Sequence, residues 1–304
     1  MNSKYDCVLF NCKSENKLSN YLLINKNAYN KLKNDFNKNS MDYYQSWKDK
    51  KGRELFSGNT EIRKIHKRLV TLFDIKKTDY LKSGTKKQSS ITNAKEHEEN
   101  NFFLFLDIQS FYPSITDKLI KKRLILDYKQ SGSVASFISN IVTVPQEKIN
   151  FDKALVTGSP LSQHFIYVIN KKMFDELEEL AKKEKMTFTV YVDDIAFSSK
   201  IIISHSFFNK VFNIIKKYQF NIHKNKTFRG TFSSKSHITG IQITKNGFRL
   251  MDKHKEKILT LVCKILKHNL EKDKKSLIGI LNYALQVNKG YSKYRYIVEK
   301  YLLQ

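Results

Sequence analysis

The chain has 304 residues, and its 40% hydrophobic and 28% charged composition is that of a globular protein with a buried core. It carries 55 Lys and Arg against 29 Asp and Glu, a formal charge of +26, which indicates nucleic acid ahead of an anionic membrane surface as partner; a lysine-rich proteome is the alternative source of this charge. The sequence has no signal peptide, no apolar run of membrane-spanning length and no close pairs among its three cysteines, so we expect a cytoplasmic protein with reduced thiols.

The first hundred residues carry little recognisable chemistry. Helices are expected over residues 19–32 and 61–72, where apolar residues recur with a helical period. Residues 82–90 combine a glycine, hydroxyls and lysines, so they form either an exposed linker or a basic loop that wraps a triphosphate. A short helix over residues 91–100 should follow, with Thr92 as its N-cap.

The middle of the chain alternates buried strands and helices. The apolar run 102–106 predicts a strand buried on both faces, and it ends at Asp107. A turn with aromatic residues and a helix over 116–130 follow it. Residues 157–160 predict a tight turn, and a long amphipathic helix should run over 161–185.

Residues 188–199 read as a β-hairpin with two adjacent carboxylates, Asp193 and Asp194, at its tip. A polar hairpin turn is the simpler interpretation, because Asp is an ordinary turn residue. A divalent cation is the alternative, since hard cations take oxygen ligands and offset the repulsion between neighbouring carboxylates. Asp107, at the end of the upstream strand, favours the cation.

The last third of the chain is the most basic. Residues 201–304 hold 21 Lys and Arg against 5 Asp and Glu. A helix is expected over 205–218, strands over 221–250, and two helices after Asp252. Tyrosines interleave with basic residues near the C-terminus, a mixture that suits nucleic acid but equally suits packing between helices.

Carboxylates on two separate strands are what two-metal nucleotidyl transfer requires. Two Mg²⁺ ions stabilise the attacking oxygen and the leaving pyrophosphate, and one strand alone cannot surround both. We expect Asp107 and Asp193 to bridge the metals and Asp194 to support them, with the backbone carbonyl of Ile108 as a further ligand.

Three stretches in the right order resemble the palm motifs of bacterial reverse transcriptases. They are Phe105–Ile115 with Asp107, Thr157–Gln163, and the Tyr-Val-Asp-Asp run at Tyr191–Asp194. Asn93-Ala94-Lys95-Glu96-His97 and Ile238-Thr239-Gly240 are similar to two elements of one branch, the retron reverse transcriptases.

This resemblance implies an α+β right-hand polymerase fold with fingers, an antiparallel palm and a helical thumb. The expected domains are residues 1–100 for the N-terminal region and fingers, 101–235 for the palm with interleaved fingers elements, and 236–304 for the palm–thumb junction and thumb. The sequence does not indicate what role residues 1–50 have.

The resemblance also implies residue roles. Tyr112 stands at the position of a steric gate that excludes ribonucleotides, with core packing as its alternative. Lys87 (with Lys86 beside it) and Ser159 are expected to bind the nucleotide. Lys226 resembles the lysine that protonates pyrophosphate, and Lys224 is its rival.

Asn93, His97, Thr239 and Gly240 are implied in recognition of the enzyme's own structured RNA. A satisfied histidine packed beside the palm is the alternative for His97. Two positions depart from the family pattern: Thr157 replaces the usual glutamine, and Val192 stands where alanine is commoner.

The implied function is RNA-directed DNA synthesis on a cognate structured non-coding RNA, primed from that RNA, within an antiphage defence system. The implied partners are the RNA, an RNA–DNA hybrid, dNTPs and a separate effector protein, with no membrane. The alternatives are another defence-associated or group II intron-like reverse transcriptase, or a catalytically silent RNA-binding scaffold. No maturase-type or endonuclease extension fits after residue 250, which disfavours the intron alternative.

Overall fold

The computed structural model describes residues 7–50, 52–74, 78–85, 87–268 and 271–302. The chain forms two compact units, each built from several segments. The first comprises residues 1–78, 108–176 and 215–221, and the second comprises residues 79–107, 177–214 and 222–304. Helices and antiparallel sheets occur in both, which confirms the α+β prediction. The boundaries expected at residues 100 and 235 stay a prediction, since compactness groups segments by contact and not by role.

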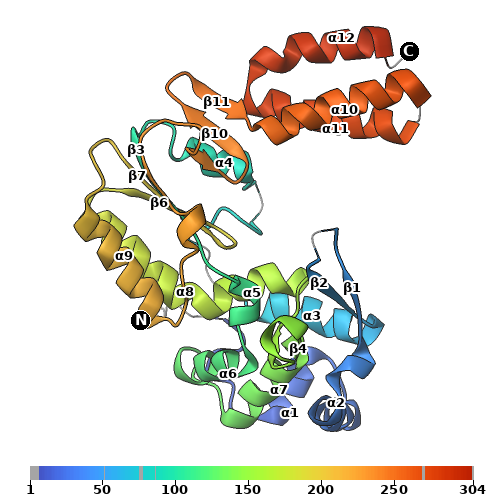
Figure 1. The fold of residues 1–304 in the computed structure, drawn as a ribbon. Coiled ribbons are helices and arrows are strands. Elements are labelled where there is room, and N and C mark those ends of the chain that lie inside the picture. The colour runs from blue at the N-terminus through green and yellow to red at the C-terminus, as the bar shows by residue number, and fades with distance from the viewer. Residues whose placement is uncertain (1–6, 51, 75–77, 86, 269–270, 303–304) are drawn as a thin grey trace. The chain divides into compact units, whose positions relative to one another are not determined.

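The first unit consists of helices and two short hairpins (Figure 1). Its helices are α1 (Glu15–Leu22), α2 (Lys26–Lys38), α3 (Thr60–Leu72), α5 (Phe111–Ser114), α6 (Asp117–Leu126) and α7 (Gly132–Val142). Its hairpins pair β1 (Tyr44–Lys48) with β2 (Glu54–Gly58), and β4 (Thr143–Pro145) with β5 (Lys153–Leu155). The long helices α8 (Pro160–Lys183) and α9 (His205–Lys217) contribute to both units.

Two helical predictions in this unit needed correction. The single helix expected over 19–32 is two helices, because Leu23 takes a left-handed conformation (φ 59°) and Asn25 caps a new start. The helix expected over 116–130 ends at Leu126, and the unpredicted α7 follows, with Ser131 as its N-cap. The helix expected over 61–72 is confirmed as α3.

The second unit contains two antiparallel sheets. The four-stranded sheet has the order β6 (Thr187–Tyr191), β7 (Asp194–Ser199), β3 (Phe102–Asp107), β8 (Phe228–Gly230). The three-stranded sheet has the order β11 (Gly247–Leu250), β10 (Ile241–Thr244), β9 (His237–Ile238). The hairpin predicted over 188–199 is therefore confirmed as β6 and β7.

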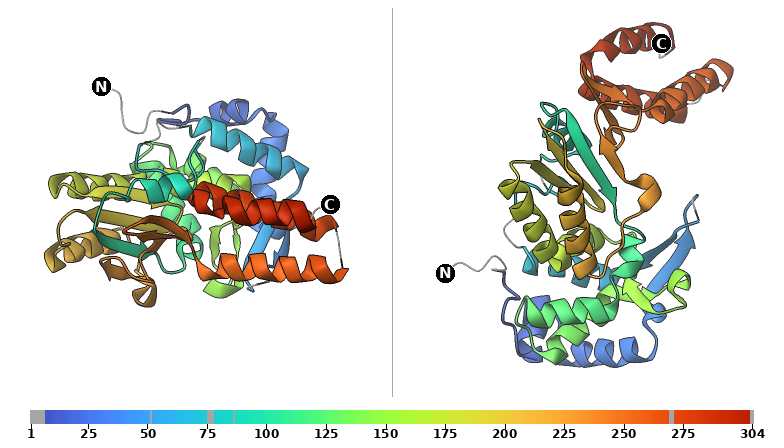
Figure 2. Two further views of the ribbon diagram at one scale, coloured as in Figure 1. Left: turned by 90° about the horizontal axis from the view of Figure 1, so that it is seen from above. Right: turned by 60° about the vertical axis from the view of Figure 1, so that its left-hand side comes forward.

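Helix α4 (Ser90–Lys95) and the C-terminal helices α10 (Asp252–His268), α11 (Glu271–Val287) and α12 (Ser292–Leu302) complete this unit. The last three form a helical group, drawn in orange and red in Figures 1 and 2. Sequence predicted two of these helices and missed α12. Helix α4 is shorter than expected, and Ser89 with Thr92 forms its capping box, so Thr92 is not the N-cap.

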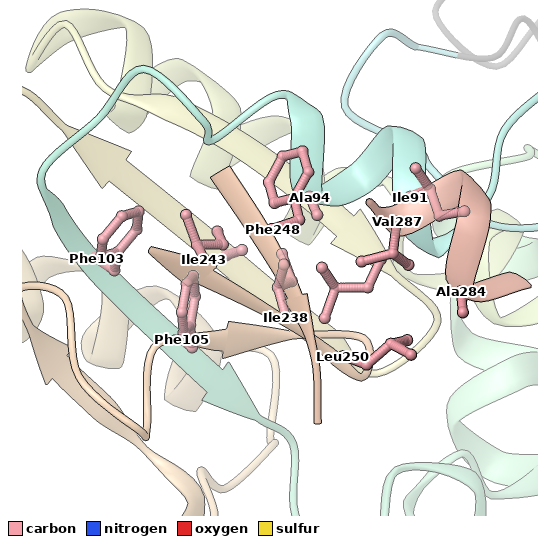
Figure 3. Packing of buried hydrophobic residues seen from close by; sticks show 12 residues of the cluster. Ile91, Ala94, Phe103, Phe105, Ile238, Ile243, Phe248, Leu250, Ala284 and Val287 are labelled. Carbon is pink, nitrogen blue, oxygen red and sulfur yellow. The ribbon is translucent and has the colours of Figure 1, made fainter. Parts of the chain in front are cut away.

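One apolar core joins these parts of the second unit (Figure 3). Phe103 and Phe105 point from one face of β3 toward Ile238 and Ile243, and Ile91 and Ala94 of α4 close the cluster with α11. Because side chains alternate along a strand, Asp107 projects from the same face of β3 as Phe103 and Phe105. The core therefore fixes the face of the sheet on which the aspartate lies.

No helix in the described part of the chain is both long and apolar enough to span a membrane.

Candidate active site

The tip of the β6–β7 hairpin is a strained two-residue turn. Tyr191 pairs with Asp194, which leaves Val192 and Asp193 as the turn. Val192 has φ 59°, a left-handed conformation that costs a β-branched residue on the order of 1–3 kcal/mol. Its N–H donates a hydrogen bond of 3.0 Å to the Ser83 hydroxyl. A side chain distant in sequence therefore stabilises the turn that carries Asp193.

Ser83 is held in place because its segment pairs with β6. Val190 donates its N–H to the Tyr80 carbonyl (2.8 Å), and Lys82 donates its N–H to the Val190 carbonyl (2.9 Å). The Lys82 ammonium is buried and pairs with Glu96 at 2.6 Å. Residues 80–83 thus form a fixed brace, and the loop with exposed lysine begins only beyond them. Lys87 is exposed there, with φ 65°, while Lys86 lies outside the described residues.

Asp107 and Asp194 lie directly opposite each other on β3 and β7. Directly paired residues of antiparallel strands have adjacent side chains on one face, and like charges there repel. Burial, followed by the charges of Asp193 and Asp107, raises the pKa of Asp194 to about 7. The three carboxylates, from β3 and the β6–β7 hairpin, therefore interact electrostatically, and their mutual repulsion disfavours the folded state.

Lys226 partly offsets this negative charge. Its ammonium donates a hydrogen bond of 2.6 Å to the Asp107 carboxylate, which raises the pKa of the lysine. It lies in the short helical turn η3 (Lys224–Lys226), directly before β8. The structure thus brings together Asp107 and Lys226, both of which were predicted to take part in the reaction.

The donor set fits a divalent cation in its chemistry. Carboxylate oxygens are the ligands that Mg²⁺ prefers, and the ammonium of Lys226 already occupies a cation position on Asp107. Among the described residues, no three His, Cys, Asp or Glu side chains converge closely enough to form a complete metal site. Ile108 is buried, and its alkyl side chain has no donor atom, so only its backbone carbonyl could add a ligand.

A groove of about 620 Å³ opens beside these carboxylates within the second unit. Asp107, Asp194 and Lys226 line one side, and Thr239 and Gly240 line it as well. The polar wall also includes Asn225 and Thr227, and its basic or aromatic residues are Lys235, His237, Lys253, His254 and Tyr283. Burial and the Lys253 charge lower the pKa of both His237 and His254, so the histidines are neutral hydrogen-bonding groups at pH 7. The groove suits a polyanion whose end reaches the carboxylates.

His97 lies in the protein core and not on the surface. It is fully buried, and its ring nitrogens contact the hydroxyls of Ser198 (2.7 Å) and Thr189 (2.8 Å). Asn100 also donates a hydrogen bond of 2.8 Å to the Ser198 hydroxyl, so Ser198 has two side-chain partners. Burial lowers the pKa of His97 to about 3 and keeps it neutral. The alternative of a packed, satisfied histidine describes His97 in this structure, and its contacts join β6 and β7.

Asn93 is also fully buried, and neither its amide nitrogen nor its oxygen has a hydrogen-bond partner among the described residues. Buried unsatisfied amides are rare and costly. With both side chains enclosed, RNA recognition by Asn93 and His97 stays a prediction and would have to act through the position of α4.

The two retron-like elements are in contact with each other. The Thr239 hydroxyl donates to the Ser90 carbonyl at the start of α4 (3.3 Å), and Ile238 packs against Ile91 and Ala94 (Figure 3). Gly240 has φ 86°, and a Cβ there would lie 3.4 Å from His254, so this turn favours glycine. Residues 149 positions apart in sequence thus form one structural element beside the groove.

Tyr112 and Ser159 belong to the first unit. Tyr112 is half-buried in α5, whereas its neighbour Phe111 is buried against Phe220 at 5.1 Å. Of the two aromatic residues, Phe111 therefore serves the core, and Tyr112 presents a partly exposed ring.

The Ser159 hydroxyl is already engaged by His66. The two atoms are 2.8 Å apart, and His66 donates its other ring N–H to the Ile141 carbonyl at 3.0 Å. Burial lowers the pKa of His66 to about 4, so the histidine accepts from Ser159. Gly158 before it has φ 101°. His66 thus fixes the turn expected to bind the nucleotide, and its sequence context gave no signal of this.

Sequence reasoning missed several groove residues, notably Lys235, Lys253 and His254. One signal could have found them: no Asp or Glu occurs between Asp194 and Asp252. A long stretch of folded chain without acidic residues, directly after a carboxylate pair, marks a surface for a polyanion.

Comparison with known proteins agrees with this geometry. The profile of the family described as "Reverse transcriptase (RNA-dependent DNA polymerase)" matches residues 24–271. The chain is 22% identical over 215 residues to the retron Ec83 reverse transcriptase of Escherichia coli, covering 66% of this chain and 67% of that protein. It is 26% identical over 243 residues to the retron Se72 reverse transcriptase of Salmonella heidelberg (strain 579083-10), covering 74% of this chain and 62% of that protein.

Among solved structures, the foamy viral protease–reverse transcriptase in complex with RNA/DNA hybrid is similar, with a TM-score of 0.44 and 17% identity. That similarity covers 79% of this chain and 27% of the viral chain. Reverse transcriptases generally use divalent metal ions.

Proposed function

This chain belongs to the reverse transcriptase (RNA-dependent DNA polymerase) family, and on that premise we propose that it copies part of a cognate structured RNA into DNA. The observation that carries the proposal is the cross-strand pair of Asp107 and Asp194, with Asp193 in the turn, beside a basic groove. Burial, together with the charges of Asp193 and Asp107, raises the pKa of Asp194 to about 7, and such an arrangement of carboxylates is expected where a bound cation compensates.

Asp107, Asp193 and Asp194, with the Ile108 carbonyl, would hold two Mg²⁺ ions. When bound, these ions supply charge stabilisation for the attacking hydroxyl and the leaving pyrophosphate. The primer end would lie in the groove, where Lys235 and Lys253 neutralise its phosphates.

Lys226 is the proton donor in this proposal. Its contact with Asp107 raises its pKa, so the ammonium is retained at neutral pH and can deliver a proton to pyrophosphate. Tyr112 would place its ring under the sugar and exclude a 2′-hydroxyl. Lys87 and the Ser159 turn would contact the triphosphate.

A right-hand arrangement accompanies this assignment. The four-stranded sheet of the second unit would be the palm and α10–α12 the thumb, while the hairpins of the first unit would belong to the fingers.

A retron-type role is supported by the contact between α4 and the Thr239 turn, since both retron-like elements meet at one edge of the groove. We propose that this element positions the cognate RNA and that synthesis begins from a 2′-hydroxyl of that RNA. A role in antiphage defence with a separate effector protein follows by analogy with such systems.

Two other functions remain to be distinguished by experiment. A different defence-associated or group II intron-like reverse transcriptase would polymerise without a branched product. A silent RNA-binding scaffold would have no need of opposed carboxylates, which the fold retains at a cost in stability.

The test is to sequence the nucleic acid that co-purifies with the protein from its own host. We expect a short DNA joined through a 2′–5′ branch to one structured RNA. Linear DNA copies of many RNAs would point to the other reverse transcriptases, and RNA with no DNA would support the scaffold.

A further inference from the structure

A second groove lies on the opposite face of the same sheet. It has a volume of about 490 Å³, within the range of about 300–1,000 Å³ typical of ligand sites, and lies wholly in the second unit. Helix α9 forms one wall with Phe208 and Phe212, and the segment before and within β8 forms the other with Lys224 and Arg229. Phe208, Phe212 and Arg229 have no role in the proposed polymerase chemistry, and Lys224, the rival of Lys226 for the proton transfer, is not the proton donor in that proposal.

The two grooves are separated by the edge strand β8. Phe228 lines the groove beside the carboxylates and packs on Phe105, whereas the next residue, Arg229, lines the second groove. This is the alternation expected along a strand. Thr227, directly before β8, lines both grooves, so the two grooves adjoin at this edge of the sheet.

The apolar wall of the second groove is aromatic and partly exposed. Phe208 and Phe212 lie one turn apart on α9 with nearly parallel rings, 6.5 Å between centroids and 26° between planes. Phe212 is 36% exposed. Other residues of this helix pack into the protein core, since Phe207, Val211 and Ile215 are buried. The fold therefore does not require Phe212 for its own packing face.

The polar groups around these rings are cationic or neutral. The Arg229 guanidinium lies 6.0 Å from the Phe208 ring, and Lys224 is exposed beside it. Asn209 supplies an amide on the helix side. No acidic residue among those that the structure describes lines this groove, so its charged lining groups, Lys224 and Arg229, are both cationic. Flat aromatic faces with interleaved cations match bases and phosphates of an unpaired strand.

We propose that this groove binds single-stranded nucleic acid, with unpaired bases against Phe208 and Phe212 and phosphates at Lys224 and Arg229. A strand leaving the groove beside the carboxylates would pass Thr227 and enter it. RNA and DNA offer the same stacking bases and charged phosphates, so the groove can bind either. Which of the two is bound depends on which single strand is present. The proposal relies on the proposed function only for the source of that strand.

The test compares two matched double variants that each remove one phenylalanine and one lysine. Phe212→Ala with Lys224→Ala changes the groove. Phe151→Ala with Lys210→Ala is the control, since Phe151 is exposed in the first unit and Lys210 pairs with Glu184 outside the groove. Labelled 25-nucleotide RNA, DNA of the same sequence, and a blunt RNA duplex are titrated by fluorescence anisotropy without dNTPs or metal.

We expect the groove variant to bind both single strands at least about fivefold more weakly than the control variant, because stacking of one base is lost. The slope of log affinity against log salt should fall by about 0.7, because one phosphate contact is lost. Phe212→Tyr with Lys224→Arg should restore binding. In the wild type, single-stranded RNA carrying 4-thiouridine should crosslink to the peptide that contains Phe208 and Phe212.

Equal affinity of the two double variants, or equal weakening for the duplex, would overturn the proposal. Absence of the α9 crosslink in the wild type would overturn it as well, and protection of α9 by an acidic peptide instead would identify a protein site. These binding results do not depend on polymerisation, so a wild type without polymerase activity would refute the proposed function and leave this groove to be judged separately.

Discussion

The buried hydrogen-bond network around His97 allows a quantitative test of what stabilises the β6–β7 hairpin. His97→Phe keeps an aromatic ring of similar size but removes both hydrogen bonds, to Ser198 on β7 and to Thr189 on β6. Thr189 then loses a partner inside the protein, and Ser198 keeps only the bond from Asn100. An unsatisfied buried hydroxyl costs about 1–3 kcal/mol, so we expect a loss of roughly 2–4 kcal/mol at pH 7.5.

The same residue predicts how this loss depends on pH. The pKa of His97 is about 3 in the folded chain and 6.5 ordinarily, because burial disfavours the charged ring. Below pH 6.5 the unfolded chain binds a proton that the folded chain rejects, so the wild type loses stability as the pH falls toward 3. At pH 5, about 1.5 pH units below the unfolded pKa, this loss is about 2 kcal/mol.

Phenylalanine does not titrate, so the variant escapes this loss. The stability difference between wild type and His97→Phe should therefore narrow by about 2 kcal/mol between pH 7.5 and pH 5, measured by urea unfolding at both. His66 titrates in both proteins and cancels. His268→Phe, at an exposed position of α10, is the control and should show no such narrowing. A difference that stays constant with pH would refute the argument that His97 is neutral and enclosed.

Three further outcomes follow from the site. Tyr112→Val should reduce discrimination against ribonucleotides by at least about tenfold in single-nucleotide incorporation. Tyr112→Phe should preserve this discrimination because the ring remains. Unchanged discrimination in both variants would show that Tyr112 is not a steric gate. Lys226→Gln should lower the incorporation rate by on the order of 100-fold, whereas the exposed Lys245→Ala should not, and a rate equal to wild type would remove Lys226 from the chemistry. Val192→Gly should raise the free energy of unfolding by up to about 1 kcal/mol, because relief of the left-handed backbone exceeds the added entropy of glycine; a loss of stability would contradict a strained turn.

Local patterns predicted the elements that hold the carboxylates. The continuous apolar run before Asp107 gave β3, and the hairpin around Asp193 and Asp194 was predicted within one residue at its start. The long helix expected over 161–185 is α8, and the helix expected over 205–218 is α9. These elements have strong period-2 or helical patterns that tertiary contacts did not override.

Elements without such patterns were missed. Helix α7 is mostly apolar and rich in β-branched residues, which favour strands, so its short polar face at Ser133, Ser136 and Asn140 is only a weak helical signal. After α11 the chain makes only a short turn around Gly290 and continues into the unpredicted α12. Leu23 breaks the first helix without glycine or proline, a change in backbone conformation that composition does not indicate.

The sequence predicted the positions of the candidate metal-binding carboxylates better than those of the residues that support them. Asp107 and Asp194 can be predicted from the sequence because Asp107 ends a strand and Asp194 begins one. The burial of His97 and Asn93 could not be read from sequence, since a short polar motif looks the same inside a core and on a surface. Thr189 and Ser198, polar residues within apolar strands, were the available signal that a buried polar partner exists.

The most direct test of the central claim is incorporation of labelled dNTPs on an RNA template with an annealed DNA primer, with and without Mg²⁺. We predict Mg²⁺-dependent extension by the wild type, none by Asp193→Asn with Asp194→Asn, and normal extension by Asp117→Asn, which changes a carboxylate in the first turn of α6. Extension by the double variant, or no extension by the wild type with any divalent ion, would contradict the account.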